Sequence, residues 1–336
     1  MVISTTLHKS SCRLTMIFAL IFVIALVDAA VVHSHSSHLN KEREEDGAYS
    51  PRNRLHASDS GEHNNEFDHE SIVGSAKEAE EYDHLPPEEA KRRLRILLTK
   101  MDLNRDEQID KKELKAWILR SFKMLSVEEA QEHLEDADEN GDGKVTWNEY
   151  IVDAYGTDES EETLTIDKEN QQLIEDDRIM WKAADRNGDD VLEGDEWVAF
   201  SHPEEHPDML PHILKQTLRD KDTDQDGSIS FQEYIGDRGK EHDKEWLHVE
   251  KDKFDHELDK DGDGKLNGNE ILSWVVPSNE DIAEEEVLHL FSTSDDDEND
   301  ILSFDEILDH HDTFVGSEAT DYGDQLHNIH HFQDEL

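Results

Sequence analysis

Six stretches of twelve residues repeat one arrangement of oxygen-bearing side chains. Each has Asp at its first position, Asp or Asn at its third and fifth positions, and Glu at its twelfth position. They begin at Asp102, Asp138, Asp185, Asp222, Asp259 and Asp295. Calcium is a hard cation that takes about six to eight oxygen ligands, and a loop of this length can wrap once around the ion. The spacing therefore predicts six Ca2+ sites, numbered here as loops 1 to 6.

The expected ligands follow from the pattern of the EF-hand calcium loop. Side chains at positions 1, 3 and 5 point inward, position 7 contributes its backbone carbonyl, position 9 often acts through water, and Glu at position 12 closes the sphere with two oxygens. In loops 1 to 3 these positions are Asp102, Asn104, Asp106, Gln108, Asp110 and Glu113; Asp138, Asn140, Asp142, Lys144, Thr146 and Glu149; and Asp185, Asn187, Asp189, Val191, Glu193 and Glu196. In loops 4 to 6 they are Asp222, Asp224, Asp226, Ser228, Ser230 and Glu233; Asp259, Asp261, Asp263, Lys265, Asn267 and Glu270; and Asp295, Asp297, Asn299, Ile301, Ser303 and Glu306.

Two further positions separate the loops and support the assignment. The pattern calls for glycine at position 6, where the backbone needs a positive φ, and loops 2, 4 and 5 have it. Loops 1, 3 and 6 have Glu107, Asp190 and Asp300 there, so we expect loops 2, 4 and 5 to bind most tightly and loop 1 most weakly. Position 8 is a branched apolar residue in all six loops, as expected where paired loops form a short antiparallel contact.

Helices must flank these loops. Pro87 suits a helix start, and Leu94, Leu98 and Met101 then recur at helical spacing up to loop 1. We therefore predict an all-α protein with six EF-hands in three pairs, joined by short antiparallel contacts between loops. Loops that are neighbours in sequence are the expected partners, as 1 with 2, 3 with 4, and 5 with 6.

The predicted organisation follows from these pairs and from composition. It comprises a signal peptide (1–29), a mostly disordered acidic and His-rich segment (30–86), a first EF-hand pair (87–157), a linker with a second pair (158–240), a third pair (241–316) and a C-terminal tail (317–336). The linker contains the acidic run 158–162. Histidines gather towards the two ends, at His33, His35 and His38 and at His327, His330 and His331, where solvated polar tails are favoured over zinc binding.

The charge of the chain excludes several classes of function. The 336 residues include 85 Asp and Glu against 33 Lys and Arg, a net charge of −52. Such a surface repels phosphate backbones, so no direct binding of nucleic acid is expected. No nucleophile motif, phosphate loop or HExxH motif is present, so we expect no enzyme.

The two ends of the sequence indicate a compartment. An apolar run from Leu14 to Val27 follows Lys9 and Arg13 and precedes small residues, which is typical of a secretory signal peptide cut near Ala29. Cleavage would leave no transmembrane segment and would remove Cys12, the only cysteine. The last four residues, 333–336 (QDEL), resemble the retrieval signal of the endoplasmic reticulum, with Gln in place of Lys or His.

Local segments from about Phe67 to the C-terminus resemble the calumenin/reticulocalbin (CREC) family. They are Phe67-Asp68-His69-Glu70, His202-Pro203-Glu204-Glu205, Glu233-Tyr234-Ile235-Gly236-Asp237, Phe314-Val315-Gly316-Ser317 and Ala319-Thr320-Asp321. The resemblance implies a low-affinity calcium-binding protein of the endoplasmic reticulum lumen, with the Golgi or secretion as further locations. It also implies partners among luminal client proteins, calcium pumps or channels, and a KDEL-type retrieval receptor.

Two functions remain open on the sequence. In the first, calcium binding folds the chain, because the crowded carboxylates of each loop repel one another without the ion, and the folded chain regulates or chaperones clients. In the second, the chain is a passive buffer of high capacity. A regulator would saturate near six ions, whereas a buffer would bind many more.

Overall fold

The computed structural model describes residues 46–50, 64–156 and 168–317. The predicted signal peptide, the acidic run 158–162, the terminal histidine clusters and the QDEL sequence lie outside the described residues. In the described part, helices flank all six loops, and the strands are short antiparallel contacts between loops, so the all-α prediction is confirmed. No helix within these ranges is long and apolar enough to cross a membrane.

The first helices precede the first calcium loop. They are α2 (Asn65–Val73), α3 (Ala76–Asp83) and α4 (Pro87–Met101). The helix predicted to begin at Pro87 is present. The expectation of disorder up to residue 86 is wrong for α2 and α3, because Phe67, Ile72 and Tyr82 are buried against the EF-hands. Tertiary burial stabilises a segment whose polar composition alone predicts disorder.

Hands 1 to 3 follow in order. Loop 1 contains β1 (Gln108–Ile109) and leads into α5 (Lys111–Ala137), which is both the exiting helix of hand 1 and the entering helix of hand 2. Loop 2 contains β2 (Val145–Thr146) and is followed by α6 (Trp147–Tyr155). Hand 3 comprises α7 (Lys168–Ala184), β3 (Val191–Leu192) and α8 (Asp195–Ser201), and the 3-10 turn η2 (Pro203–Glu205) follows it.

Hands 4 to 6 complete the described chain. Hand 4 comprises α9 (Leu210–Lys221), β4 (Ile229–Ser230) and α10 (Phe231–Ile235), with α11 (Arg238–Glu241) after it. Hand 5 comprises α12 (Lys244–Lys253), which continues as the π-helical turn η3 (Phe254–Leu258), β5 (Lys265–Leu266) and α13 (Gly268–Val275). Hand 6 comprises α14 (Asn279–Ser294), β6 (Leu302–Ser303) and α15 (Phe304–Asp309), followed by α16 (His311–Val315).

The loops pair differently from the sequence-based expectation. β1 pairs with β6, β2 with β3, and β4 with β5, each antiparallel. The position-8 residues face each other in every pair and are fully buried, as expected: Ile109 with Leu302, Val145 with Leu192, and Ile229 with Leu266. Three pairs are therefore confirmed, but their partners are hands 1 and 6, 2 and 3, and 4 and 5.

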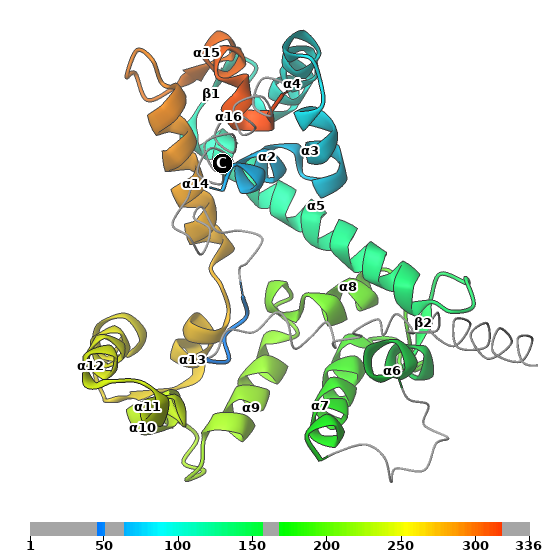
Figure 1. Ribbon diagram of the computed structural model, residues 1–336, viewed down its shortest axis with the longest axis vertical. Coiled ribbons are helices and arrows are strands. Elements are labelled where there is room, and N and C mark those ends of the chain that lie inside the picture. Colours follow the sequence, from blue (N-terminus) through cyan, green and yellow to red (C-terminus); the bar gives the residue numbers. More distant parts are fainter. Residues whose placement is uncertain (1–45, 51–63, 157–167, 318–336) are drawn as a thin grey trace, which may run out of the picture. The chain divides into compact units, whose positions relative to one another are not determined.

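Helix α5 explains why hands 1 and 2 do not pair. It runs unbroken for 27 residues between the two loops (Figure 1). At about 1.5 Å per residue it holds them about 40 Å apart, which is too far for strand pairing. The segment from loop 1 to loop 2 contains neither Gly nor Pro before Gly141, whereas Gly156, in the left-handed conformation, ends α6 before hand 3 begins.

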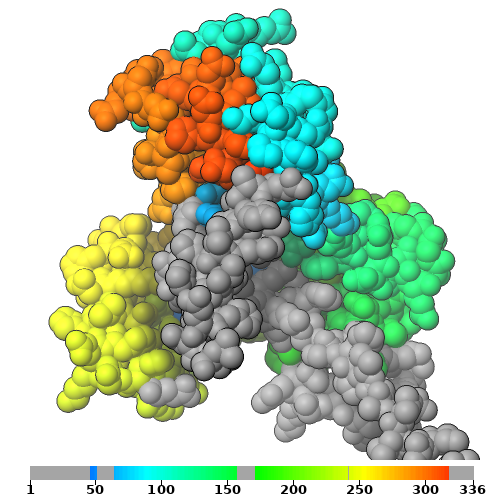
Figure 2. Space-filling view, turned by 45° about the horizontal axis from the view of Figure 1, so that its top comes forward, coloured from blue at the N-terminus to red at the C-terminus, as the bar shows by residue number. Residues whose placement is uncertain are grey.

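The pairing produces two hydrophobic cores. One core, here the 1/6 core, unites hands 1 and 6 with α2 and α3, so that it joins segments from both halves of the chain. In Figure 2 the orange surface of hand 6 lies directly against the cyan surface of hand 1. The other, here the 2–5 core, is built from hands 2 to 5, and Trp181 and Trp197 are buried in it.

The family-like segments at residues 67–70 and 314–317 meet in the 1/6 core. His69, which is nearly buried, faces the backbone oxygen of Asp312 (3.0 Å) and the carboxylate of Asp83 (3.2 Å). Gly316 has φ +67°, and a Cβ at this position would collide with the Asp83 carboxylate and the His69 ring. Only glycine permits this approach, so the end of hand 6 closes on the helices that precede hand 1.

Candidate calcium-binding loops

The first aspartate of every loop holds the turn that follows it. In all six loops one of its carboxylate oxygens accepts a hydrogen bond from the backbone N–H at position 6, at 2.7–2.9 Å. The side chain at position 5 accepts one from the N–H at position 7, at 2.8–3.1 Å. These bonds wrap the backbone around the acidic side chains in the way that the spacing predicts.

The glutamate at position 12 connects the two ends of its loop. In loop 5, Glu270 accepts hydrogen bonds from the N–H groups of Lys260 (2.8 Å) and Asn267 (3.1 Å), and it is 8% exposed. In loop 4, burial alone would raise the pKa of Glu233, but hydrogen bonds from Ser230 and Thr223 lower that pKa to about 2. The carboxylate is thereby kept ionised, which is the form that binds a metal.

Carboxylates converge most closely in the second half of the chain. Three acidic groups approach within 4.8 Å of one another in each of loops 4, 5 and 6. They are Asp222, Asp224 and Glu233; Asp259, Asp261 and Asp263; and Asp295, Asp297 and Glu306. Among the described residues, loops 1 to 3 hold no such triad. Their third position is Asn, which offers a neutral amide oxygen instead of a charge.

Like charges in the triads already act on one another. A hydrogen bond from the Asp263 backbone would lower the pKa of Asp261, yet desolvation and the charges of Asp263, Glu270 and Asp259 raise it. A divalent cation at this place would remove that repulsion. Calcium is the ion whose preferred ligands are carboxylate and carbonyl oxygens in a flexible loop.

Lysines cross between paired loops and contact expected ligands. Lys144 of loop 2 pairs with Glu193 of loop 3 at 2.7 Å, and Lys265 of loop 5 pairs with Asp226 of loop 4. Glu193 and Asp226 are the expected ligands at positions 9 and 5. A calcium ion must therefore compete with the lysine of the neighbouring loop for these two carboxylates, which weakens its binding.

Each loop contains a second position of positive φ, which was not identified from the sequence. Position 4, like position 6, has a positive φ in all six loops. Loops 2 and 5 place glycine at both positions, whereas loop 4 has Gln225 (φ 60°) at position 4. The sequence does contain a signal for this positive φ, because Gly141, Gly188 and Gly262 occupy position 4 of loops 2, 3 and 5.

Counting both positions changes the expected order of affinities. Loops 1 and 6 each carry two non-glycine residues at positive φ, which are Arg105 and Glu107 in loop 1 and Glu298 and Asp300 in loop 6. Such a residue costs about 1–2 kcal/mol. Loops 2 and 5 carry none, and loops 3 and 4 carry one each. Because hands 1 and 6 are partners, the two most strained loops belong to the same pair.

Relief of this strain should tighten calcium binding by hand 1. We expect the double variant Arg105→Gly/Glu107→Gly to strengthen binding at the weakest site by about tenfold or more, because each positive φ costs about 1–2 kcal/mol and about 1.4 kcal/mol is tenfold. Isothermal titration calorimetry of the whole chain measures the change. The matched control is Gln108→Gly, at a strand position where glycine relieves no positive φ. A titration identical to that of the unmodified chain would contradict the assigned strain.

Comparison with known proteins gives the family. A family model described as an EF-hand domain pair matches residues 91–152 and 174–236. Reticulocalbin-2 of Crotalus adamanteus is 39% identical over 285 residues, which cover 82% of this chain and 93% of that protein. Reticulocalbin-2 of Mus musculus is also 39% identical, over 82% of this chain and 89% of that protein. The chain belongs to the calumenin/reticulocalbin (CREC) family.

Membership of the CREC family confirms the resemblance found in the sequence, and together with the EF-hand model it identifies a calcium-binding protein. No solved structure matches the chain. The two matched ranges each span two hands that are neighbours in sequence, 1 with 2 and 3 with 4. In this CREC chain, however, no loop pairs with the other loop of its own matched range, because loop 1 pairs with loop 6, loop 2 with loop 3, and loop 4 with loop 5.

Proposed function

We propose that this CREC protein acts in the lumen of the endoplasmic reticulum or elsewhere in the secretory pathway, where calcium binding completes its fold and the folded chain regulates or chaperones client proteins. The residues named for the six loops are the proposed ligands. Calcium pumps or channels are candidate clients, and a KDEL-type receptor is the candidate for retrieval. The signal-like residues 1–29 and the QDEL sequence support the location.

One observation carries the proposal: every calcium loop contributes a fully buried residue to one of the two cores. The position-8 residues Ile109, Val145 and Leu192, and their equivalents in the other loops, are 0% exposed. In a loop without its ion, several close carboxylates repel one another. This repulsion disturbs the packing of the buried position-8 residue of the same loop. Binding of calcium and packing of the cores are therefore linked.

The stabilisation by calcium is large enough to matter for a marginal fold. If free calcium equals the dissociation constant at six independent sites, binding contributes about 2.5 kcal/mol in total. Typical domains are stable by about 5–15 kcal/mol. Changes in luminal calcium could thus shift the population of folded chains that can bind a client.

Calcium titration followed by circular dichroism tests coupled folding. We expect helicity to rise and the hydrodynamic radius to fall between a chelator and millimolar calcium, while magnesium at the same concentration produces less change. Helicity that stays constant throughout would reject coupled folding. Retention of luminal proteins by the immobilised chain, compared with and without calcium, then tests client binding.

The alternative function is a passive calcium buffer, which is favoured by the 85 acidic residues. Equilibrium dialysis distinguishes the two functions. Saturation near six ions supports the regulator, whereas continued uptake well beyond six ions at millimolar calcium supports the buffer.

A further inference from the structure

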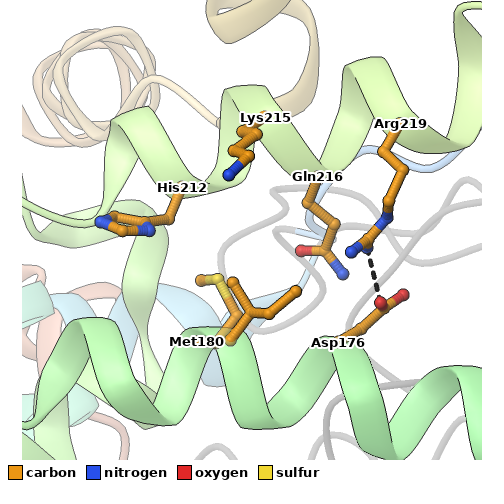
Figure 3. Close-up of a pocket in the computed structure, with 7 residues that line it drawn as sticks. Asp176, Met180, His212, Lys215, Gln216 and Arg219 are labelled. Carbon is orange, nitrogen blue, oxygen red and sulfur yellow. Dashed lines mark ion pairs between the residues drawn. The ribbon is translucent and has the colours of Figure 1, made fainter.

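A pocket of about 130 Å³ lies between α7 and α9, the entering helices of hands 3 and 4 (Figure 3). Its apolar part comes from Ile179 and Met180 on α7. Met180 is buried, whereas Ile179 is 42% exposed although it is a large apolar residue. A cavity of about 150 Å³ lined by apolar side chains holds a group as large as benzene, so this pocket suits one aliphatic or small aromatic side chain.

The opposite side of the pocket is cationic. His212, Lys215 and Arg219 line it from α9, as Figure 3 shows. Helix α9 carries Lys215, Arg219 and Lys221 against a single acid, Asp220, in a chain whose net charge is −52. The α9 wall of the pocket is thus a local reversal of the overall charge. At physiological salt, charges beyond about 8 Å are largely screened, so the nearby cations decide which ligand is attracted.

Arg219 and Lys215 differ in their ion pairing. The guanidinium of Arg219 is 2.6 Å from the buried carboxylate of Asp176, which also accepts a hydrogen bond from Gln172. This ion pair lies at one end of the pocket, and the Asp176 carboxylate neutralises the charge of Arg219. Lys215 is exposed and forms no ion pair within the described ranges 46–50, 64–156 and 168–317. Its ammonium group is available to a ligand.

Both walls of the pocket end in calcium loops. Helix α7 ends one residue before Asp185, the first position of loop 3, and α9 ends one residue before Asp222, the first position of loop 4. Loops 3 and 4 belong to different pairs, because loop 3 pairs with loop 2 and loop 4 with loop 5. The spacing of the walls therefore depends on two loops that belong to separate pairs.

We propose that this pocket binds an acidic client segment, one of whose apolar side chains enters between Ile179 and Met180 while a flanking carboxylate pairs with Lys215. The inference rests on the proposed client binding and names the chemistry of the client. A basic segment would meet Lys215 with like charge, and a segment without apolar side chains would leave Ile179 exposed to water.

The test is fluorescence anisotropy with a labelled eight-residue peptide that alternates Glu and Leu, at millimolar calcium and 0.15 M salt. We expect Lys215→Glu to weaken binding at least tenfold, and Ile179→Glu to do the same. The matched control is Arg95→Glu, which makes the same change of charge at an exposed position of the cationic helix α4, and its affinity should stay within twofold. Peptides alternating Lys with Leu and Glu with Ser should bind at least tenfold more weakly.

Several outcomes would overturn the proposal. Affinity for the Glu–Leu peptide that is the same in Lys215→Glu and the unmodified chain would exclude the pocket. Equal binding of the Lys–Leu peptide would exclude selection of acidic segments. Self-association that Lys215→Glu abolishes, measured by light scattering without peptide, would assign the pocket to a second copy of the chain instead of a client.

Circular dichroism titrations of the same variants separate this proposal from the function on which it rests. Calcium-dependent folding together with absent peptide binding would overturn the pocket alone. Peptide binding that requires Lys215 but is identical in chelator and calcium would support the pocket and contradict calcium control of clients.

Discussion

A chain with cysteines at Gln108 and Ser303 should form an intramolecular disulfide in calcium, although 194 residues of sequence separate them. These two residues are register partners between β1 and β6. Partners in an antiparallel ladder have Cα atoms about 4.5–5.5 Å apart, within the range of about 4.4–6.8 Å that a disulfide spans. We expect nearly complete cross-linking of Gln108→Cys/Ser303→Cys on mild oxidation of protein expressed without residues 1–29.

The matched control places the second cysteine in the loop that follows loop 1 in sequence. Thr146 occupies position 9 of loop 2, as Ser303 does in loop 6, so Gln108→Cys/Thr146→Cys tests pairing of hands 1 and 2. We expect no intramolecular cross-link in this variant, because α5 separates the loops. Mobility on non-reducing gels and mass spectrometry of tryptic peptides give the result. A cross-link between 108 and 146 would contradict the fold.

The second large effect is a loss of stability with rising pH that depends on Glu286. This residue of α14 is fully buried, and its Oε1 accepts a hydrogen bond from Ser71 of α2 at 3.1 Å. Asp68 of α2, which is 1% exposed and lies 3.3 Å from the imidazole of His289, is its charged neighbour. Burial, and then the charge of Asp68, raise the pKa of Glu286 from 4.5 to about 8.

Stability decreases with rising pH because the folded chain prefers the protonated form of Glu286. A carboxyl with a raised pKa in the folded chain keeps its proton there while the unfolded chain has released it. The contribution of protonated Glu286 to the free energy of unfolding is therefore complete below pH 4.5 and is lost as the pH rises towards 8. At about 1.4 kcal/mol per pH unit, the whole interval corresponds to at most about 5 kcal/mol, and the part between pH 6 and 8 to about 2 kcal/mol.

The variant Glu286→Gln should remove this dependence, because the amide is neutral at every pH and its oxygen can still accept the bond from Ser71. We expect its free energy of unfolding in urea, at saturating calcium, to exceed that of the unmodified chain at pH 8.5 by several kcal/mol, with a smaller difference at pH 6. Glu285→Gln, at the exposed neighbouring position of α14, should leave the pH dependence unchanged. Parallel pH profiles for Glu286→Gln and the unmodified chain would refute the assignment.

The calcium loops were predictable because their chemistry is local. In the EF-hand pattern twelve consecutive residues supply every ligand, so the spacing of acids, the terminal Glu and the apolar eighth residue define each loop without reference to the rest of the chain. The family-like segments were also visible, but their roles were not. Asp68 and His69 read as polar residues of a disordered segment, whereas both are buried in the 1/6 core.

Sequence by itself determined that this is a calcium-binding EF-hand protein, where each loop begins, and that the loops meet in three pairs. It also predicts which residues surround each ion. Only the tertiary structure decided that hand 1 meets hand 6, that α2 and α3 join their core, and that α7 and α9 form a cationic pocket. Loop geometry depends on bonds and torsions a few residues apart, which a repeating pattern records. Pairing depends on whether the intervening helix is continuous and on which apolar faces remain to be covered, and residues far apart in the chain settle both.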